Sequence, residues 1–139
     1  MNIIKLDKLD KYINLPYKNV GRDFNGVDCF GLVYLIYKNE LNIELPDFTN
    51  LMYSKNWFKE GKNIIVENVW DKWYEVDKTE QTDLLLFYTN YKKRVVNHIG
   101  LYIGNDKFIH ILETYSSKID RLDGRWNKLL YKILRYGVK

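Results

Sequence analysis

Cysteine, proline and histidine are scarce in this sequence: the 139 residues include one cysteine, two prolines and two histidines. A single cysteine cannot form an internal disulfide, so the fold does not depend on one. No apolar run approaches the ~20 residues of a transmembrane helix. The first ten residues alternate apolar and charged side chains, unlike a signal peptide. We therefore expect no membrane span and no ordinary export signal.

The remaining composition is that of a globular protein. Hydrophobic residues make up 46% and aromatic residues 16%, which is enough apolar material for one core in one domain, residues 1–139. This composition excludes a disordered or fibrous chain. The net charge of +4 favours an anionic partner such as a bacterial wall. Nucleic acid would also suit that charge, but no nucleic-acid-binding motif is present.

Apolar spacing divides the chain into a helical half and a strand half. We expect an amphipathic helix over residues 3–13, a loop over 15–27 and a second helix from Cys29 to about Glu40. Asn14 suits a left-handed stop after the first helix. The period then changes, and residues 49–70 suit one or two short helices. Strands are expected at 72–76, 83–88 (central), 98–103 and 108–112, loops at 89–96 and 115–124, and a short helix running into a last strand over 126–136. Helices followed by strands indicate an α+β fold.

The cysteine lies at the start of the second predicted helix. Asp28 is a good N-cap residue, which puts Cys29 in the first helical turn. Unpaired backbone N–H groups and the helix dipole there favour the thiolate, the nucleophilic form. The plainer interpretation is a buried cysteine that acts as a small apolar side chain.

Two histidines, His98 and His110, lie on consecutive predicted strands that flank a turn at 104–107. Two even-numbered residues share a face across a hairpin only if the numbers of paired residues add to an even value. A two-residue turn pairs residue 104 with residue 107, whose sum is odd, so it places the histidines on opposite faces of the sheet. A three-residue loop or a β-bulge near the turn places them on the same face. A joint role therefore predicts such an irregularity, with His110 approaching His98 diagonally.

Cys29, His98 and His110 together suit two kinds of chemistry. A cysteine nucleophile needs a base, and the base needs a third group to orient it. Three such side chains can also be zinc ligands with an open fourth position. The close ligand pairs that usually build a zinc site are absent from the sequence. We therefore expect no metal and no cofactor.

Several separated motifs resemble one family. Val27-Asp28-Cys29-Phe30-Gly31-Leu32-Val33 resembles the nucleophile motif "DCSGLV" of the NlpC/p60 cysteine peptidases. The family's "HVGIYIG", "FIHA", "GDLLLF" and "PY" motifs resemble segments 98–104, 108–110, 83–87 and 16–17 in the expected order. A narrower resemblance, to phage-tail and gene-transfer-agent members, comes from residues 44–48 and from the closing segment Trp126–Tyr136.

The resemblance implies a papain-like α+β fold, with N-terminal helices packed on a C-terminal antiparallel sheet. It also implies a peptidoglycan endopeptidase that cuts stem-peptide amide bonds. By motif position Cys29 would be the nucleophile, His98 the base and acid, and His110 the orienting residue. Tyr17 would contribute to the oxyanion hole. The partners would be the stem peptide and other phage tail proteins, in a virion tail or in the host cytoplasm before assembly.

Departures from the family pattern concern the surroundings of these residues. Thr82 replaces a glycine, so its turn must avoid positive φ or be strained. Arg22 and Asp23, in the loop before the cysteine, are candidates for binding a charged peptide end, or form a solvated pair. The basic loop 92–94 is a further candidate for contacting substrate. Two other functions stay open: a structural tail-assembly protein with little activity, and a cysteine amidase or acyltransferase on a small acyl substrate.

Overall fold

A computed structural model describes residues 3–46, 72–90, 92 and 95–137. The elements are η1 (Leu6–Tyr12), β1 (Arg22–Asp23), β2 (Gly26–Val27), α1 (Cys29–Leu41), β3 (Trp73–Val76), β4 (Leu84–Asn90), β5 (Val95–Gly104), β6 (Lys107–His110), β7 (Lys118–Arg121), α3 (Gly124–Leu129) and β8 (Leu130–Tyr136). The main sheet has the order β3-β8-β4-β5-β6-β7, with every pairing antiparallel. The predicted α+β class is confirmed. The helices expected within 49–70 lie outside the described residues.

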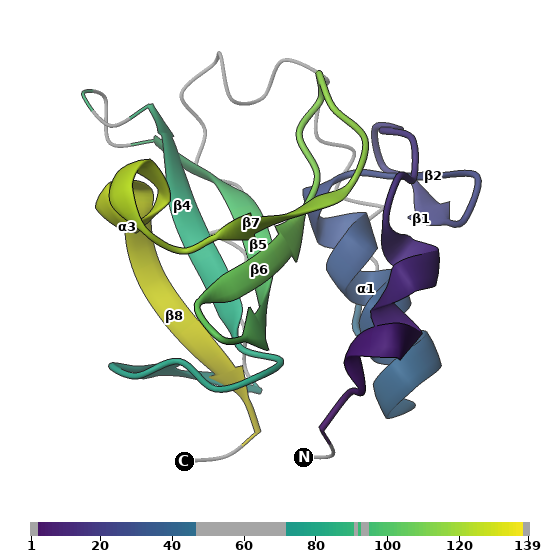
Figure 1. The fold of residues 1–139 in the computed structure, drawn as a ribbon, viewed down its shortest axis with the longest axis horizontal. Helices are drawn as coiled ribbons and strands as arrows, with labels where there is room; N and C mark the ends of the chain where they lie inside the picture. Colours follow the sequence, from purple (N-terminus) through teal and green to yellow (C-terminus); the bar gives the residue numbers. More distant parts are fainter. Residues whose placement is uncertain (1–2, 47–71, 91, 93–94, 138–139) are drawn as a thin grey trace.

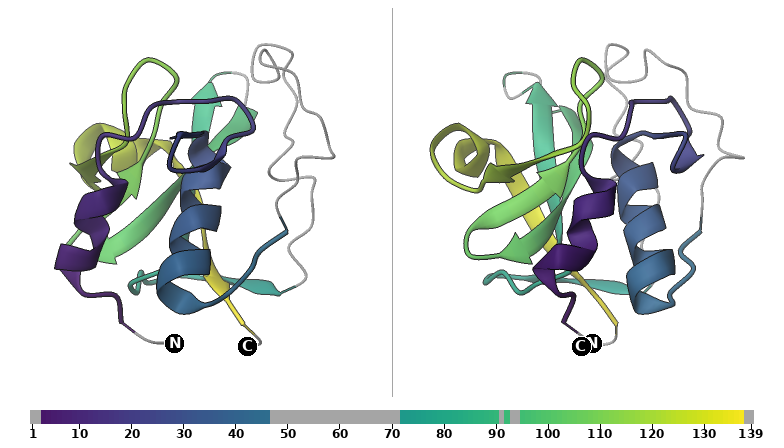
Figure 2. Two further views of the ribbon diagram at one scale, coloured as in Figure 1. Left: turned by 90° about the vertical axis from the view of Figure 1, so that its right-hand side faces the viewer. Right: turned by 45° about the vertical axis from the view of Figure 1, so that its right-hand side comes forward.

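Helix α1 is the central helix of the fold and begins and ends as predicted. The Asp28 carboxylate accepts a hydrogen bond from the Gly31 N–H, and Asn42 ends the helix in the left-handed conformation. Every residue from Cys29 to Tyr37 is buried. The helix and η1 lie side by side on one side of the sheet (Figures 1 and 2), and α1 contacts both η1 and β5.

The first helix differs from the prediction. The expected amphipathic helix over 3–13 is a 3-10 helix, η1, of seven residues. Three residues per turn align Leu9 and Tyr12, which are both buried, while Ile3 is 82% exposed. Asn14 has a φ of 68° and is the left-handed stop expected from the sequence.

The sheet is covered on both faces. In the central strand β4, Leu84 and Leu86 join the core beneath α1, whereas Leu85 and Phe87 join a second core that includes Trp126. Figure 1 shows α1 and α3 on opposite sides of the sheet. Because β4 is buried on both faces, its sequence is a continuous run of apolar residues rather than an alternation of apolar and polar ones. No helix in the described ranges is long and apolar enough to span a membrane.

The β5–β6 hairpin contains the predicted irregularity. Gly104 pairs with Lys107 across a two-residue turn, but Tyr102 pairs with Phe108, so the register shifts between them. After the shift, the numbers of paired residues add to an even value, as for Tyr102 and Phe108. Continuing this register places His110 opposite Gly100. His98 and His110 therefore share one face of the sheet and meet diagonally, as the prediction required.

The loops expected at 89–96 and 115–124 are partly wrong. Strand β4 continues to Asn90 and β5 starts at Val95, so the first loop is shorter. The second contains strand β7, which pairs with β6. The segment Lys118–Arg121 is short and polar and has no apolar alternation. It forms a strand because it pairs with the neighbouring strand β6.

The last segment, 126–136, forms a helix followed by a strand as predicted. Strand β8 inserts between β3 and β4. Arg135 holds it there: its Nε and Nη2 donate to the two carboxylate oxygens of Asp83 at 2.9 and 2.8 Å. Thr82, just before this aspartate, has a φ of 78°, so the turn is strained rather than free of positive φ.

Candidate active site

The cap of α1 fixes the position of Cys29. Besides the Gly31 N–H, the Asp28 carboxylate accepts hydrogen bonds from the Val20 N–H at 3.0 Å and from Arg22 Nη1 at 2.8 Å. Asp28 and Arg22 are both largely buried, with side-chain exposures of 3% and 10%. This arrangement ties the loop that precedes the helix to the first turn, directly beside the thiol.

Burial, rather than the helix terminus, dominates the acidity of Cys29. Loss of solvent, with a smaller contribution from the charge of Asp28, raises the pKa of the thiol to about 12. Hydrogen bonds from the backbone of Ile99 and Phe30 lower it, by less than burial raises it. The thiolate favoured by the sequence argument is therefore wrong for the substrate-free site, where Cys29 is a neutral thiol.

The two histidines belong to a buried hydrogen-bonded chain that continues to Asp120. His98 Nε2 lies 2.8 Å from His110 Nδ1, and His110 Nε2 lies 2.7 Å from Asp120 Oδ2. His98 and His110 are buried, and the Asp120 side chain is 28% exposed. Asp120 was not predicted as a site residue, because a loop was expected over residues 115–124. The segment Lys118–Arg121 has no apolar alternation, so the sequence offered no signal for a strand there.

The chemistry of Asp120 sets the proton positions along this chain. An ionised carboxylate only accepts hydrogen bonds, so we assign the proton of neutral His110 to Nε2. His110 Nδ1 is then an acceptor, and His98 Nε2 must be the donor to it. This assignment leaves Nδ1 of His98 without a proton, which is the state of a general base.

Aromatic rings shield the histidines from water. The Trp126 ring lies 5.8 Å from that of His98 and 4.8 Å from that of His110, and Phe87 lies 5.7 Å from His98. Burial lowers the pKa of His98 well below its usual value, and His110 lowers it further. Burial also lowers the pKa of His110, although Asp120 opposes this. Both rings are therefore neutral near pH 7.

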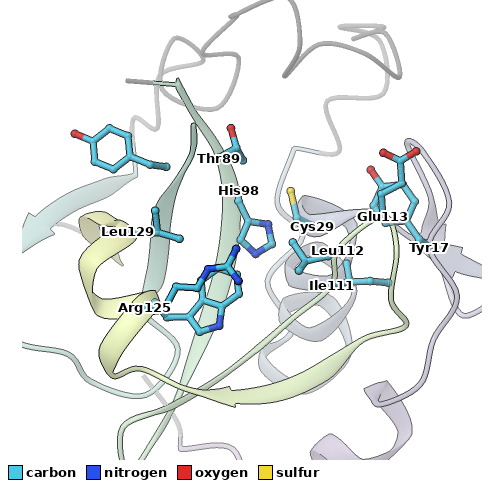
Figure 3. A pocket seen from close by; sticks show the side chains of 11 residues that line it. Tyr17, Cys29, Thr89, His98, Ile111, Leu112, Glu113, Arg125 and Leu129 are labelled. Carbon is cyan, nitrogen blue, oxygen red and sulfur yellow. The ribbon is translucent and has the colours of Figure 1, made fainter. Parts of the chain in front are cut away.

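A cavity of about 270 Å³ brings Cys29, His98 and Tyr17 together. Figure 3 shows His98 and Cys29 between Tyr17 and Glu113 on one side and Arg125 and Leu129 on the other. Burial raises the pKa of Tyr17 above its usual value, and Cys29 adds to this. The phenol thus keeps its proton and can donate a hydrogen bond in the cavity.

The other predicted binding residues lie elsewhere. Arg22 contacts the Asp28 cap and the Phe30 ring. Asp23, an exposed residue of the β1–β2 hairpin, accepts a hydrogen bond from the Asn25 N–H. Neither lines the cavity, and their contact with substrate stays a prediction. Within the basic loop, Lys92 is exposed, and residues 93–94 lie outside the described part.

Across the described residues, no group of three or more His, Cys, Asp and Glu side chains has an arrangement that could hold a metal ion. Both nitrogens of His110 are already hydrogen-bonded, to His98 and Asp120. The geometry therefore suits proton transfer between side chains better than coordination of zinc.

Comparison with known sequences matches residues 14–135 to the NlpC/P60 family. The murein DD-endopeptidase MepH of Escherichia coli K12 is 32% identical over 107 residues, which cover 76% of this chain and 34% of that protein. The tail tip assembly protein K of Escherichia phage lambda is 26% identical over 132 residues, which cover 92% of this chain and 63% of that protein.

Solved structures agree with the sequence matches. An NlpC/P60 family protein from Bacillus cereus superposes with a TM-score of 0.63 at 26% identity, over 90% of this chain and 36% of that one. This chain spans from about a third to less than half of the length of the murein endopeptidases it matches. The shared region contains all the cavity residues named above.

Proposed function

Because this chain belongs to the NlpC/P60 family, we propose that residues 1–139 form one cysteine peptidase domain that hydrolyses amide bonds in peptidoglycan stem peptides. Its relatives include murein DD-endopeptidases. The observation that carries the proposal is the cavity in which Cys29 faces His98, with His98 bonded in turn to His110 and Asp120. A packing role for the cysteine would not require this chain of buried polar groups.

The reaction we propose begins with a neutral pair. The Cys29 thiol gives its proton to Nδ1 of His98 as sulfur attacks the amide carbonyl, forming a C–S bond. Tyr17 and backbone N–H groups at the start of α1 hold the oxyanion, a contribution of ~3 kcal/mol in comparable sites. His98 then protonates the leaving amine as the C–N bond breaks. A water molecule, deprotonated by His98, hydrolyses the thioester and restores the thiol.

In this reaction His110 and Asp120 are positioning residues. The imidazolium formed on His98 stays hydrogen-bonded to His110 Nδ1, whose opposite nitrogen donates to Asp120. The carboxylate therefore stabilises positive charge on the histidine pair, although it does not touch the substrate. No step requires a metal or a cofactor.

Purified protein and its Cys29→Ala variant, incubated with insoluble peptidoglycan, test this function. We expect the wild type to release soluble peptides with new termini, identified by mass spectrometry, and the variant to release none. Release by neither protein would leave the structural or small-substrate functions. A small acyl substrate predicts turnover of simple amides or thioesters by the wild type alone.

We also propose that the protein acts in a phage tail. The match to the lambda tail tip assembly protein K, over 92% of this chain, supports this setting. Mass spectrometry of purified tails and of tail-assembly intermediates should then detect the chain. Its absence from both would contradict the phage setting without touching the peptidase function.

A further inference from the structure

The cavity has apolar walls and two opposite charges. Its lining includes the cation Arg125 and the anion Glu113, on either side of Cys29. Figure 3 shows Glu113 beside Tyr17, and Arg125 with Leu129 on the α3 side. The charge of Glu113 is close enough to raise the pKa of Tyr17. A peptide across this cavity would therefore meet a negative group at one end and a positive group at the other.

The proposed reaction fixes which end of the substrate each charge meets. His98 must deliver a proton to the leaving amine, so the leaving residue lies on the His98 side of Cys29. The Trp126 ring is 5.8 Å from the His98 ring, and the Arg125 guanidinium lies 5.8 Å from the centre of the Trp126 ring. Arg125 therefore flanks the leaving residue, and Tyr17 and Glu113 flank the acyl residue.

Arg125 also differs from the other arginines of the described part. Arg22, Arg121 and Arg135 each pair with an aspartate. Arg125 instead contacts the Trp126 ring, and no carboxylate within the described ranges forms an ion pair with it. It is exposed at the cavity wall. A guanidinium in this position can bind a carboxylate through two parallel hydrogen bonds.

We propose that Arg125 binds a free carboxylate on the leaving residue, so that the enzyme selects acidic peptides whose leaving amino acid is not amidated. This inference rests on the proposed peptidase function, since that function supplies the direction of the substrate. The apolar face of Trp126 supports the guanidinium, and the substrate itself covers the contact and removes it from water. Hydrogen bonds to a charged group under such cover change rates by about tenfold or more.

Two substrate pools test the inference. One is a soluble muropeptide digest with free carboxylates. The other is the same digest after carbodiimide coupling in a large excess of methylamine, which converts the carboxylates to methylamides. The wild type, Arg125→Gln, Arg125→Lys and the control Lys128→Gln are compared by kcat/KM on each pool. Lys128 is an exposed cation on the same helix that does not line the cavity.

We expect the wild type and Lys128→Gln to prefer the free-carboxylate pool by about tenfold or more. Arg125→Gln should cut both pools at similar, low rates, and Arg125→Lys should regain part of the preference. A wild type without preference, or an Arg125→Gln variant that keeps it, overturns the inference and leaves the peptidase function standing. A wild type that cuts neither pool, nor intact peptidoglycan, overturns the function and the inference with it.

Discussion

Replacing Asp120 with alanine should slow the chemical step without weakening substrate binding. The change removes the acceptor that lies 2.7 Å from His110 Nε2. A hydrogen bond to a charged group contributes ~1.5–3 kcal/mol. Because the Asp120 side chain is 28% exposed and also lies 3.5 Å from Lys118 Nζ, we take the lower end. The expected loss in kcat is about tenfold, with KM unchanged, since Asp120 does not line the cavity.

Steady-state kinetics on a soluble muropeptide measure this effect, with Asp123→Ala as the control. Asp123 is exposed and pairs with Arg121 on the surface. The pH profile separates positioning from simple loss of fold. Asp120 raises the pKa of His110, so removing it should move the acid limb of kcat to lower pH. A variant that keeps its kcat within twofold, or that loses activity with an unmoved acid limb, would refute the positioning role.

Two further predictions concern stability. Arg22→Met should lower the free energy of unfolding by about 3 kcal/mol, because it removes the cation that lies 2.8 Å from the buried Asp28 carboxylate. Asp23→Asn, at an exposed position, should change the free energy of unfolding by less than about 0.5 kcal/mol. Equal effects of the two substitutions in chemical denaturation would contradict the cap geometry. Since burial lowers the pKa values of His98 and His110, the unfolded chain binds protons that the native state does not. The free energy of unfolding should therefore fall as the pH drops below about 6.5, by up to ~1.4 kcal/mol per pH unit for each histidine. A double glutamine variant with the same slope between pH 7 and 5 would contradict this.

Local signals in the sequence predicted much of the fold. The Asp28 cap, the apolar run of β4 and the parity of the two histidines each depend on neighbours within one element or one hairpin. The bulge between Tyr102 and Gly104 could be predicted because one residue of slippage moves a side chain to the other face of the sheet. Elements that depend on distant partners were less predictable, such as the short polar strand β7.

In the candidate site, too, the residues marked by local sequence signals were predicted and those that depend on distant contacts were not. Cys29, His98, His110 and Tyr17 were found through spacing and resemblance, and the structure places them around or next to one cavity. Asp120 was missed because only the pairing of β7 with β6 brings it to His110. The protonation state of Cys29 was also wrong from sequence, because burial depends on the packing of the whole domain.

One wall of the cavity comes from helix α3. Arg125 and Trp126 lie far from Cys29 in sequence, and α3 brings both to the cavity. Arg22 illustrates the opposite error, since a charged residue in a loop near the nucleophile is bound to the Asp28 cap. Charge and proximity in sequence alone did not distinguish an arginine that faces the cavity from one that stabilises a helix.

The most direct test of the account is to trap the acyl-enzyme. The protein is mixed with a soluble muropeptide digest, quenched in acid within the first turnovers and measured as an intact protein by mass spectrometry. A covalent intermediate on Cys29 predicts a mass increase equal to the acyl part of a stem peptide. Digestion should locate this increase to the fragment that contains Cys29, and Cys29→Ala should show none. Continued release of cleaved peptide by Cys29→Ala, or an adduct on another residue, would contradict such an intermediate.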